Sequence, residues 1–167
     1  MLDFVPDISR DVRFFGLYET VFLLYVEKHG EEEALEFMHE LFSRALKPAY
    51  DQMNFAKGNA YDFARCVGER DKSVGLHVRF PKISADRIVY EFHTDPFPNL
   101  KGYIDPRRFD AAYMNFKIAY LLGEDWSYET PEHIWENGEF TRHIITKSHR
   151  LGMKIPAHAM EEIQAVV

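Results

Sequence analysis

Two runs of alternating apolar and polar residues, joined by a short break, constrain the fold of this chain most. They lie in residues 74–95, VGLHVRFPKISADRIVYEFHTD. Successive side chains of a β-strand point to opposite faces, so the alternation predicts two strands that each have one apolar face. A turn around residues 82–86 closes the two strands into a hairpin.

The polar face of this hairpin collects ionisable side chains. A turn centred near Ser84 places His77 opposite Glu91 and Gly75 opposite His93. A change of register by one residue would exchange the two faces of a strand, so the pairing decides which side chains meet. We expect the two histidines and the glutamate to share one face.

Apolar residues at helical spacing fill most of the chain before this hairpin. Gly30 can end a first helix, and the glutamates at 31–33 suit the first turn of a second. Pro48 cannot continue a helix interior, so we expect it to begin a short third helix that reaches Gly58. Asn59 is then the cap of a fourth helix.

Two further signals follow the hairpin. The pair Asp105-Pro106 predicts a helix start, because aspartate caps helices and proline fits their first turn, and Gly123 ends that helix. The pair Asn137-Gly138 tolerates positive φ angles and predicts a second hairpin with a two-residue loop.

The second hairpin has no purely apolar face. With a two-residue loop, Trp135 faces Phe140 and Glu132 faces His143. Such a hairpin can border a polar cavity or a partner, or can lie at the edge of a sheet. The three alternatives stay open at this point.

This order of elements predicts an α+β fold, in which N-terminal helices precede β-β-α-β-β and helices cover one antiparallel sheet. We expect a single domain over residues 1–167. Residues 1–72 form its helical part and residues 73–147 its sheet part. Residues 148–167 form a C-terminal tail with a short helix.

Composition excludes several classes of function. The 167 residues carry a net charge of −7, which argues against nucleic-acid binding because phosphates need a basic surface. No apolar run approaches the roughly 20 residues that span a bilayer, so we expect no membrane partner. The N-terminal residues lack the pattern of a signal peptide, and we expect a cytoplasmic protein. The aromatic share of 15% indicates a bulky core, an apolar pocket or an oligomer interface.

The polar face of the first hairpin supplies candidate catalytic residues. His77, Glu91 and His93 share that face, and Asp95 follows at the strand end. Two imidazoles and two carboxylates suit an acid–base pair. They could also hold a divalent metal, although a metal site usually needs a further ligand from elsewhere, and we assign none. The alternative is a solvated face with a cross-strand pair.

Candidate ligand-binding residues come from the later helix and the second hairpin. Tyr113 and Phe116 lie on the apolar stripe of that helix, and Trp135 and His143 lie in the hairpin. Together they could line an apolar pocket. The alternative is that this stripe belongs to the core, which is the more common role of such a stripe.

Cys66 is the one cysteine in the chain, which excludes an internal disulfide and a cysteine zinc cluster. A single intracellular cysteine can be a nucleophile. Its neighbours Ala64 and Val67 favour the alternative, a small core residue.

The run HGEEEALEFM at residues 29–38 resembles the helix start of the L-2-amino-thiazoline-4-carboxylic acid hydrolase-like family. The later order of hairpin, long helix and a strand leading into NGEF at 137–140 resembles the same family. It is also similar, more distantly, to 4-vinyl reductase and haem-NO-binding domains. The resemblance spans residues 18–146 and implies an α+β ligand-binding fold.

The chain departs from that family at its cysteines. Members carry them after the second strand of the first hairpin, on the middle helix and near the last strand. Here Asp95, Ala112 or Tyr113, and Arg142 or His143 stand in those regions. The resemblance therefore implies no thiol chemistry for this chain.

The resemblance and the residues together suggest a hydrolase-like enzyme for C–N bonds of a small polar molecule, such as a cyclic amidine or an amino-acid derivative. Glu91 or Asp95 would be the general base, and His77 or His93 would orient or protonate the substrate. One alternative is a non-catalytic binding or sensor module with an aromatic pocket, and another is a structural dimerisation domain. The sequence requires no cofactor; we expect a small-molecule ligand and a homodimer.

Overall fold

The computed structural model describes residues 10–148 and has the expected α+β fold. Three helices precede two strands, and a fourth helix precedes two more. The helices are α1 (Arg10–His29), α2 (Glu31–Asp51), α3 (Ala60–Ser73) and α4 (Pro106–Leu121). The strands are β1 (Val78–Ile83), β2 (Arg87–Phe92), β3 (Trp126–Glu132) and β4 (Thr141–Lys147), and two 3₁₀ turns are η1 (Pro98–Leu100) and η2 (Ile134–Glu136). The expected tail helix lies outside the described residues.

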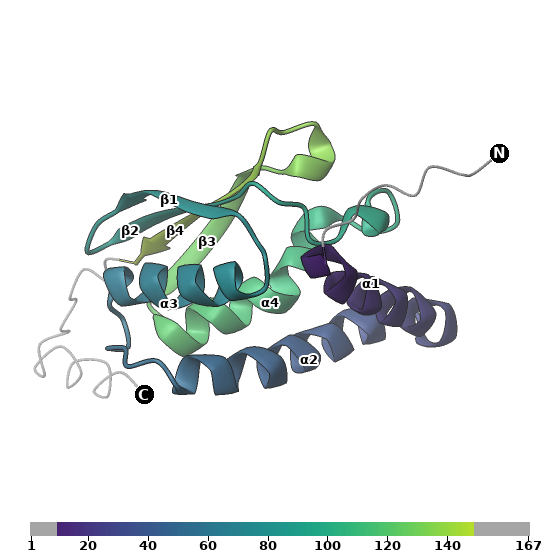
Figure 1. Ribbon diagram of the computed structural model, residues 1–167, viewed down its shortest axis with the longest axis horizontal. Helices are drawn as coiled ribbons and strands as arrows, with labels where there is room; N and C mark the ends of the chain where they lie inside the picture. The colour runs from purple at the N-terminus through teal and green to yellow at the C-terminus, as the bar shows by residue number, and fades with distance from the viewer. Residues whose placement is uncertain (1–9, 149–167) are drawn as a thin grey trace, which may run out of the picture.

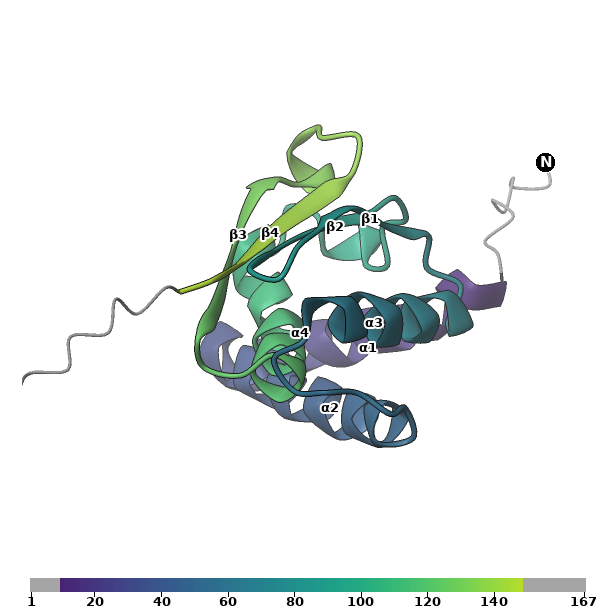
Figure 2. The ribbon, with the colours of Figure 1, turned by 90° about the vertical axis from the view of Figure 1, so that its left-hand side faces the viewer.

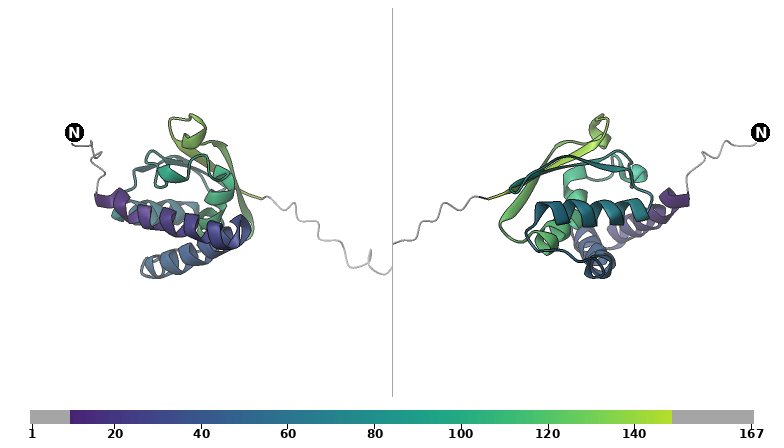
Figure 3. Two further views of the ribbon diagram at one scale, coloured as in Figure 1. Left: turned by 90° about the vertical axis from the view of Figure 1, so that its right-hand side faces the viewer. Right: turned by 60° about the vertical axis from the view of Figure 1, so that its left-hand side comes forward.

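The four strands form one antiparallel sheet in the order β1-β2-β4-β3. Figure 1 shows α3 and α4 against one face of this sheet, with α2 beneath them on the side away from the strands. The turned views in Figures 2 and 3 agree that all four helices lie on that side. The opposite face of the sheet, called here the outer face, carries no helix in the described part of the chain.

The first hairpin has a different register from the one expected. Arg79 lies opposite Glu91, and the His93 amide donates to the His77 carbonyl, so the pairing is shifted by two residues. The expected pairing of His77 with Glu91 is wrong. Because the shift is an even number of residues, each side chain stays on its expected face of the sheet. A shift by an odd number would have exchanged the two faces. A bulge between Arg79 and Lys82 adds a residue to β1.

The second hairpin does not have a two-residue loop. Glu132 pairs with Arg142 instead of His143, and the chain between β3 and β4 forms the 3₁₀ turn η2. Side chains hold this turn, because His133 accepts the Trp135 amide and the Thr141 hydroxyl accepts the Ile134 amide. Such local bonds compete with strand pairing. Trp135 is therefore buried in the turn instead of facing Phe140 across a ladder.

Helix ends follow the sequence signals at three places. Gly30 has φ 89° after α1, in the left-handed region that suits glycine. The Asn59 side chain accepts the Tyr61 and Asp62 amides at 2.9 and 3.1 Å at the start of α3. The Asp105 carboxylate accepts the Arg108 amide at 3.1 Å at the start of α4.

Pro48 does not end α2, which continues to Asp51, and the short helix expected to reach Gly58 is absent from this described segment. Pro48 is exposed near the end of the helix, where losing one backbone hydrogen bond is less disruptive. Leu46 and Tyr50 are buried on either side of it and keep the last turn packed.

Aromatic rings dominate the core between the helices. Phe109 of α4 makes edge-to-face contacts with Phe22, Phe42 and Phe97, at ring-centre distances of 5.1, 6.2 and 4.9 Å. Geometries of this kind add to the area that the rings bury. No helix in residues 10–148 is both long and apolar enough to cross a membrane.

Candidate functional site

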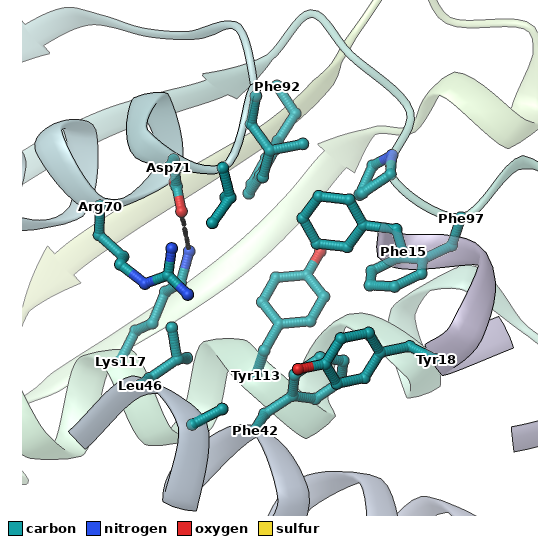
Figure 4. Close-up of a pocket in the computed structure, with 14 residues that line it drawn as sticks. Phe15, Tyr18, Phe42, Leu46, Arg70, Asp71, Phe92, Phe97, Tyr113 and Lys117 are labelled. Atoms are coloured by element: carbon teal, nitrogen blue, oxygen red, sulfur yellow. Dashed lines mark hydrogen bonds and ion pairs between the residues drawn. The ribbon is translucent and has the colours of Figure 1, made fainter. Parts of the chain in front are cut away.

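A pocket of about 60 Å³ lies among the helices and the two segments that flank the first hairpin. Figure 4 shows aromatic rings on one side of it and charged groups at its other end, called here the charged end. Six aromatic, five aliphatic and three charged residues line it: Phe15, Tyr18, Phe42, Phe92, Phe97 and Tyr113; Ala45, Leu46, Val74, Leu76 and Pro96; Arg70, Asp71 and Lys117.

The aromatic wall comes from three helices and from Phe97 in the segment after β2. Phe15 of α1 contacts Phe97 edge to face at 5.5 Å, and Tyr18 stacks on Phe42 of α2 at 5.5 Å. Phe42 in turn contacts Tyr113 of α4 edge to face at 5.8 Å. Each ring is held by a neighbour, so the apolar wall is preformed.

The charged end contains a buried ion pair. Lys117 Nζ lies 3.3 Å from Asp71 Oδ1 and 3.4 Å from Oδ2, and both residues are only 3% exposed. The Tyr90 hydroxyl donates to Asp71 Oδ2, and Lys117 Nζ donates to the Tyr90 oxygen at 3.0 Å. Both oxygens of this carboxylate are therefore occupied by protein donors.

Three rings surround the ammonium of Lys117. Its Nζ lies 5.2, 5.4 and 5.5 Å from the ring centres of Tyr90, Phe92 and Tyr113, within range of cation–π attraction. Burial lowers the pKa of Lys117, and the Asp71 carboxylate opposes that effect. Burial, reinforced by Asp71, holds the pKa of Tyr90 well above its usual value, so the phenol stays a donor.

Arg70 brings a second cation to the charged end. Figure 4 draws Arg70 at the same end of the pocket as Lys117, and its positive charge adds to burial in lowering the pKa of that lysine. Arg70 Nη1 donates to the Ser73 hydroxyl at 3.1 Å. Its Nε is buried and has no hydrogen-bond partner within the described residues. The charged end thus holds two cations and one carboxylate, and no group in residues 10–148 accepts from the Arg70 Nε donor.

A second buried polar group lies behind Tyr113. The Tyr113 hydroxyl donates to Asp110 Oδ1 at 2.6 Å, and His133 Nε2 lies 3.4 Å from Asp110 Oδ2. His133 Nδ1 accepts the Trp135 amide, so its proton is assigned to Nε2 and points toward the carboxylate. The long 3.4 Å contact does not meet hydrogen-bond geometry, and Oδ2 has no other partner among the described residues. This group fixes Tyr113 against the pocket.

His143 belongs to β4, and its side chain is fully buried on the side of the sheet that the helices cover. Its Nδ1 bonds the Thr130 hydroxyl at 2.9 Å, and its Nε2 is buried without a partner in residues 10–148. Burial lowers the pKa of His143 to about 4. The imidazole is therefore neutral at neutral pH.

The expected catalytic residues His77, Glu91 and His93 lie together on the outer face, away from the pocket. Arg142 Nε donates to Glu91 Oε1 at 2.9 Å, and its Nη2 lies 2.8 Å from the same oxygen in an ion pair. His93 Nε2 lies 3.2 Å from Glu91 Oε2, and its ring centre lies 5.3 Å from that of exposed His77. Glu91 is thus buried beneath its own partners.

Asp95 does not join that group. Its Oδ1 accepts the Phe97 amide at 2.9 Å, and its Oδ2 accepts the indole N–H of Trp135 at 2.8 Å. Burial raises the pKa of Asp95, although these two donors oppose the effect. Its contacts tie the chain after β2 to the turn η2, which is a structural role.

The expected ligand-binding residues separate as well. Tyr113 lines the pocket, whereas Phe116, Trp135 and His143 are not part of its lining. Phe116 stacks on Tyr120 at 5.2 Å instead.

Sequence patterns did not single out Arg70, Asp71 or Lys117. The first two stand in the charged run ERDK at residues 69–72, which is typical of a solvated helix end. One signal was available: Lys117 lies four residues after Tyr113 on the apolar side of the helix, where a charged residue is rarely buried unless paired.

Within the described residues, no group of three or more His, Cys, Asp and Glu side chains is arranged to hold a metal ion. Cys66 is buried in the core, and burial raises the pKa of its thiol, which disfavours the thiolate form of a nucleophile.

Comparison with models of known families finds no match for this chain, and comparison with curated proteins finds no significant relative. The resemblance to the hydrolase-like family stays an expectation.

Proposed function

We propose that this protein binds a small, mainly apolar molecule in the pocket between the aromatic wall and the charged end. The observation that carries this proposal is that one cavity combines an aromatic wall with a buried charged end. Ligand sites in proteins are mostly apolar concavities with a few polar groups that fix orientation. The buried Lys117–Asp71 pair costs desolvation energy, and specific function is one reason to retain such a pair.

The size of the pocket limits its ligand. A cavity of roughly 150 Å³ binds benzene. The pocket here measures about 60 Å³, so it encloses only part of a ring-sized molecule. The remainder would lie where the half-exposed lining residues, Tyr18 and Leu76 among them, meet solvent.

Binding accounts for the geometry better than hydrolysis by the outer-face residues. Glu91 is held by Arg142 and His93, and Asp95 is held by two donors elsewhere. Hydrolysis by either carboxylate stays a prediction. Turnover that is lost in Glu91→Gln or Asp95→Asn, with the fold intact, would support it.

The proposal is tested by filling the pocket. Ala45 of α2 lines it, so Ala45→Leu places a larger side chain inside without touching the charged end. Ala49, one turn later and outside the lining, provides the matched control Ala49→Leu. Native mass spectrometry of protein from its own host should show a retained small molecule in the wild type and the control, and none in Ala45→Leu. Equal retention in all three variants, or none in any, would contradict the proposal.

We also propose a homodimer that uses α1. Leu17 and Leu24 are 64% and 50% exposed, and their seven-residue spacing places them on one side of the helix. Contiguous apolar patches on a protein surface are typical of association sites, and in this proposal Leu17 and Leu24 belong to one such patch. Sedimentation should find a dimer for the wild type and a monomer for Leu17→Glu with Leu24→Glu. A monomeric wild type would contradict this proposal.

A further inference from the structure

We propose that the pocket selects small carboxylic acids with an apolar body, and that Arg70 and Lys117 bind the carboxylate. This inference rests on the proposed binding function and specifies its ligand. It rests on the charges and the unpaired hydrogen-bond donor at the charged end.

Among the residues that line the pocket, the charged end has more positive groups than negative ones, although Asp110, outside the lining and behind Tyr113, also attracts Lys117. Arg70 and Lys117 line it with Asp71, the one carboxylate in the pocket lining. Both oxygens of Asp71 already accept donors from Lys117 or Tyr90. Asp71 therefore pairs with Lys117, whereas Arg70 makes no ion pair with a carboxylate in residues 10–148, and an anion from outside would pair with Arg70.

Arg70 has the donors that such an anion needs. Its Nη1 bonds Ser73, whereas its buried Nε has no partner in the described chain. Leaving a buried donor unpaired is unfavourable, and such a group in a folded protein calls for an explanation. The planar fork of a guanidinium matches the two oxygens of a carboxylate.

The adjoining wall selects the rest of the ligand. Phe92, Tyr113 and Leu46 lie next to the charged groups and offer no charge of their own. A strongly hydrated polyanion would lose its hydration against these rings, whereas an aryl or alkyl group gains from burial. A monocarboxylate with a short apolar body meets both requirements.

The test compares acids with their neutral amides. Benzoate and benzamide, and hexanoate and hexanamide, are titrated calorimetrically into the wild type, Arg70→Gln and Arg65→Gln. Arg65 lies on the same helix, but its guanidinium bonds Asp62 and the Asn54 carbonyl. Arg65→Gln therefore controls for the loss of one positive charge. Thermal unfolding confirms that each variant is folded, and Arg70→Lys replaces Arg70→Gln if the latter is not.

We expect each acid to bind the wild type and Arg65→Gln at least about tenfold more tightly than its amide, and Arg70→Gln to lose that preference. Arg70→Lys, which keeps the charge without the planar fork, should retain part of it. Equal binding of acids and amides to the wild type would overturn the inference and leave the binding function standing. Equal loss of the preference in Arg65→Gln and Arg70→Gln would mean that the preference for acids arises from general electrostatics. That result would also overturn the inference. If none of the four compounds binds, the binding function fails together with the inference.

Discussion

The burial of His143 makes the stability of this protein depend on pH in a predictable way. The pKa of this imidazole is about 4 in the folded protein, against 6.5 for the ordinary side chain. Between these values the unfolded chain binds a proton that the folded chain does not, so stability falls as the pH falls. The stability associated with the neutral His143 imidazole is fully present above pH 6.5 and is lost as the pH falls toward 4.

The magnitude follows from the size of the shift. Each pKa unit corresponds to about 1.36 kcal/mol, so the whole shift represents about 3 kcal/mol. Lowering the pH from about 7.5 to about 5 covers the upper part of that range and should remove about 2 kcal/mol of unfolding free energy.

The assay is urea unfolding of the wild type and His143→Gln at both pH values. Glutamine does not titrate, yet it can still bond the Thr130 hydroxyl. The other titrating groups are common to both proteins, so their effects cancel in the difference. The wild type should lose about 2 kcal/mol more than the variant between the two pH values. Equal losses would show that His143 is not held neutral by burial, and would refute the reasoning.

Three further predictions concern stability in urea. Lys117→Met leaves the buried Asp71 carboxylate without its cation and should cost about 3–5 kcal/mol, most of which is recovered when Asp71→Asn is added; a single variant as stable as the wild type would argue against the ion pair. Trp135→Phe removes the indole donor of Asp95 and should cost about 1–2 kcal/mol, and an unchanged midpoint would mean that this bond adds nothing. Asn59→Ala removes the cap of α3 and should cost about 1 kcal/mol, a value that a cost near zero would contradict.

Local chemistry made much of the fold predictable from the sequence. The caps at Asn59 and Asp105 depend only on residues within three positions of each cap. The faces of β2 follow from alternation, and Tyr90 and Phe92 point to the core as expected. Such features need no knowledge of the rest of the chain.

The predictions from sequence were wrong where distant or competing contacts determine the local structure. Pro48 remains inside α2 because buried side chains on either side hold the helix. The second hairpin lost its two-residue loop because His133 and Thr141 bond the turn and Trp135 packs inward. In the first hairpin a bulge, which alternation does not encode, accompanied the shift in register.

The candidate site was the least predictable part for a related reason. Asp71 and Lys117 are 46 residues apart in sequence and meet only because α3 and α4 lie under the same sheet. A carboxylate near a helix end and a lone lysine in an apolar stripe each have common local explanations. Only their contact in space identifies the charged end.

Intermolecular nuclear Overhauser effects to a bound ligand test the central claim most directly. With methyl-labelled protein and benzoate in excess, the ring protons should show contacts to the methyl groups of Ala45, Leu46 and Val74, which line the pocket. Contacts confined to the exposed methyl groups of Leu17 and Leu24, or none at all, would contradict a ligand site in this pocket.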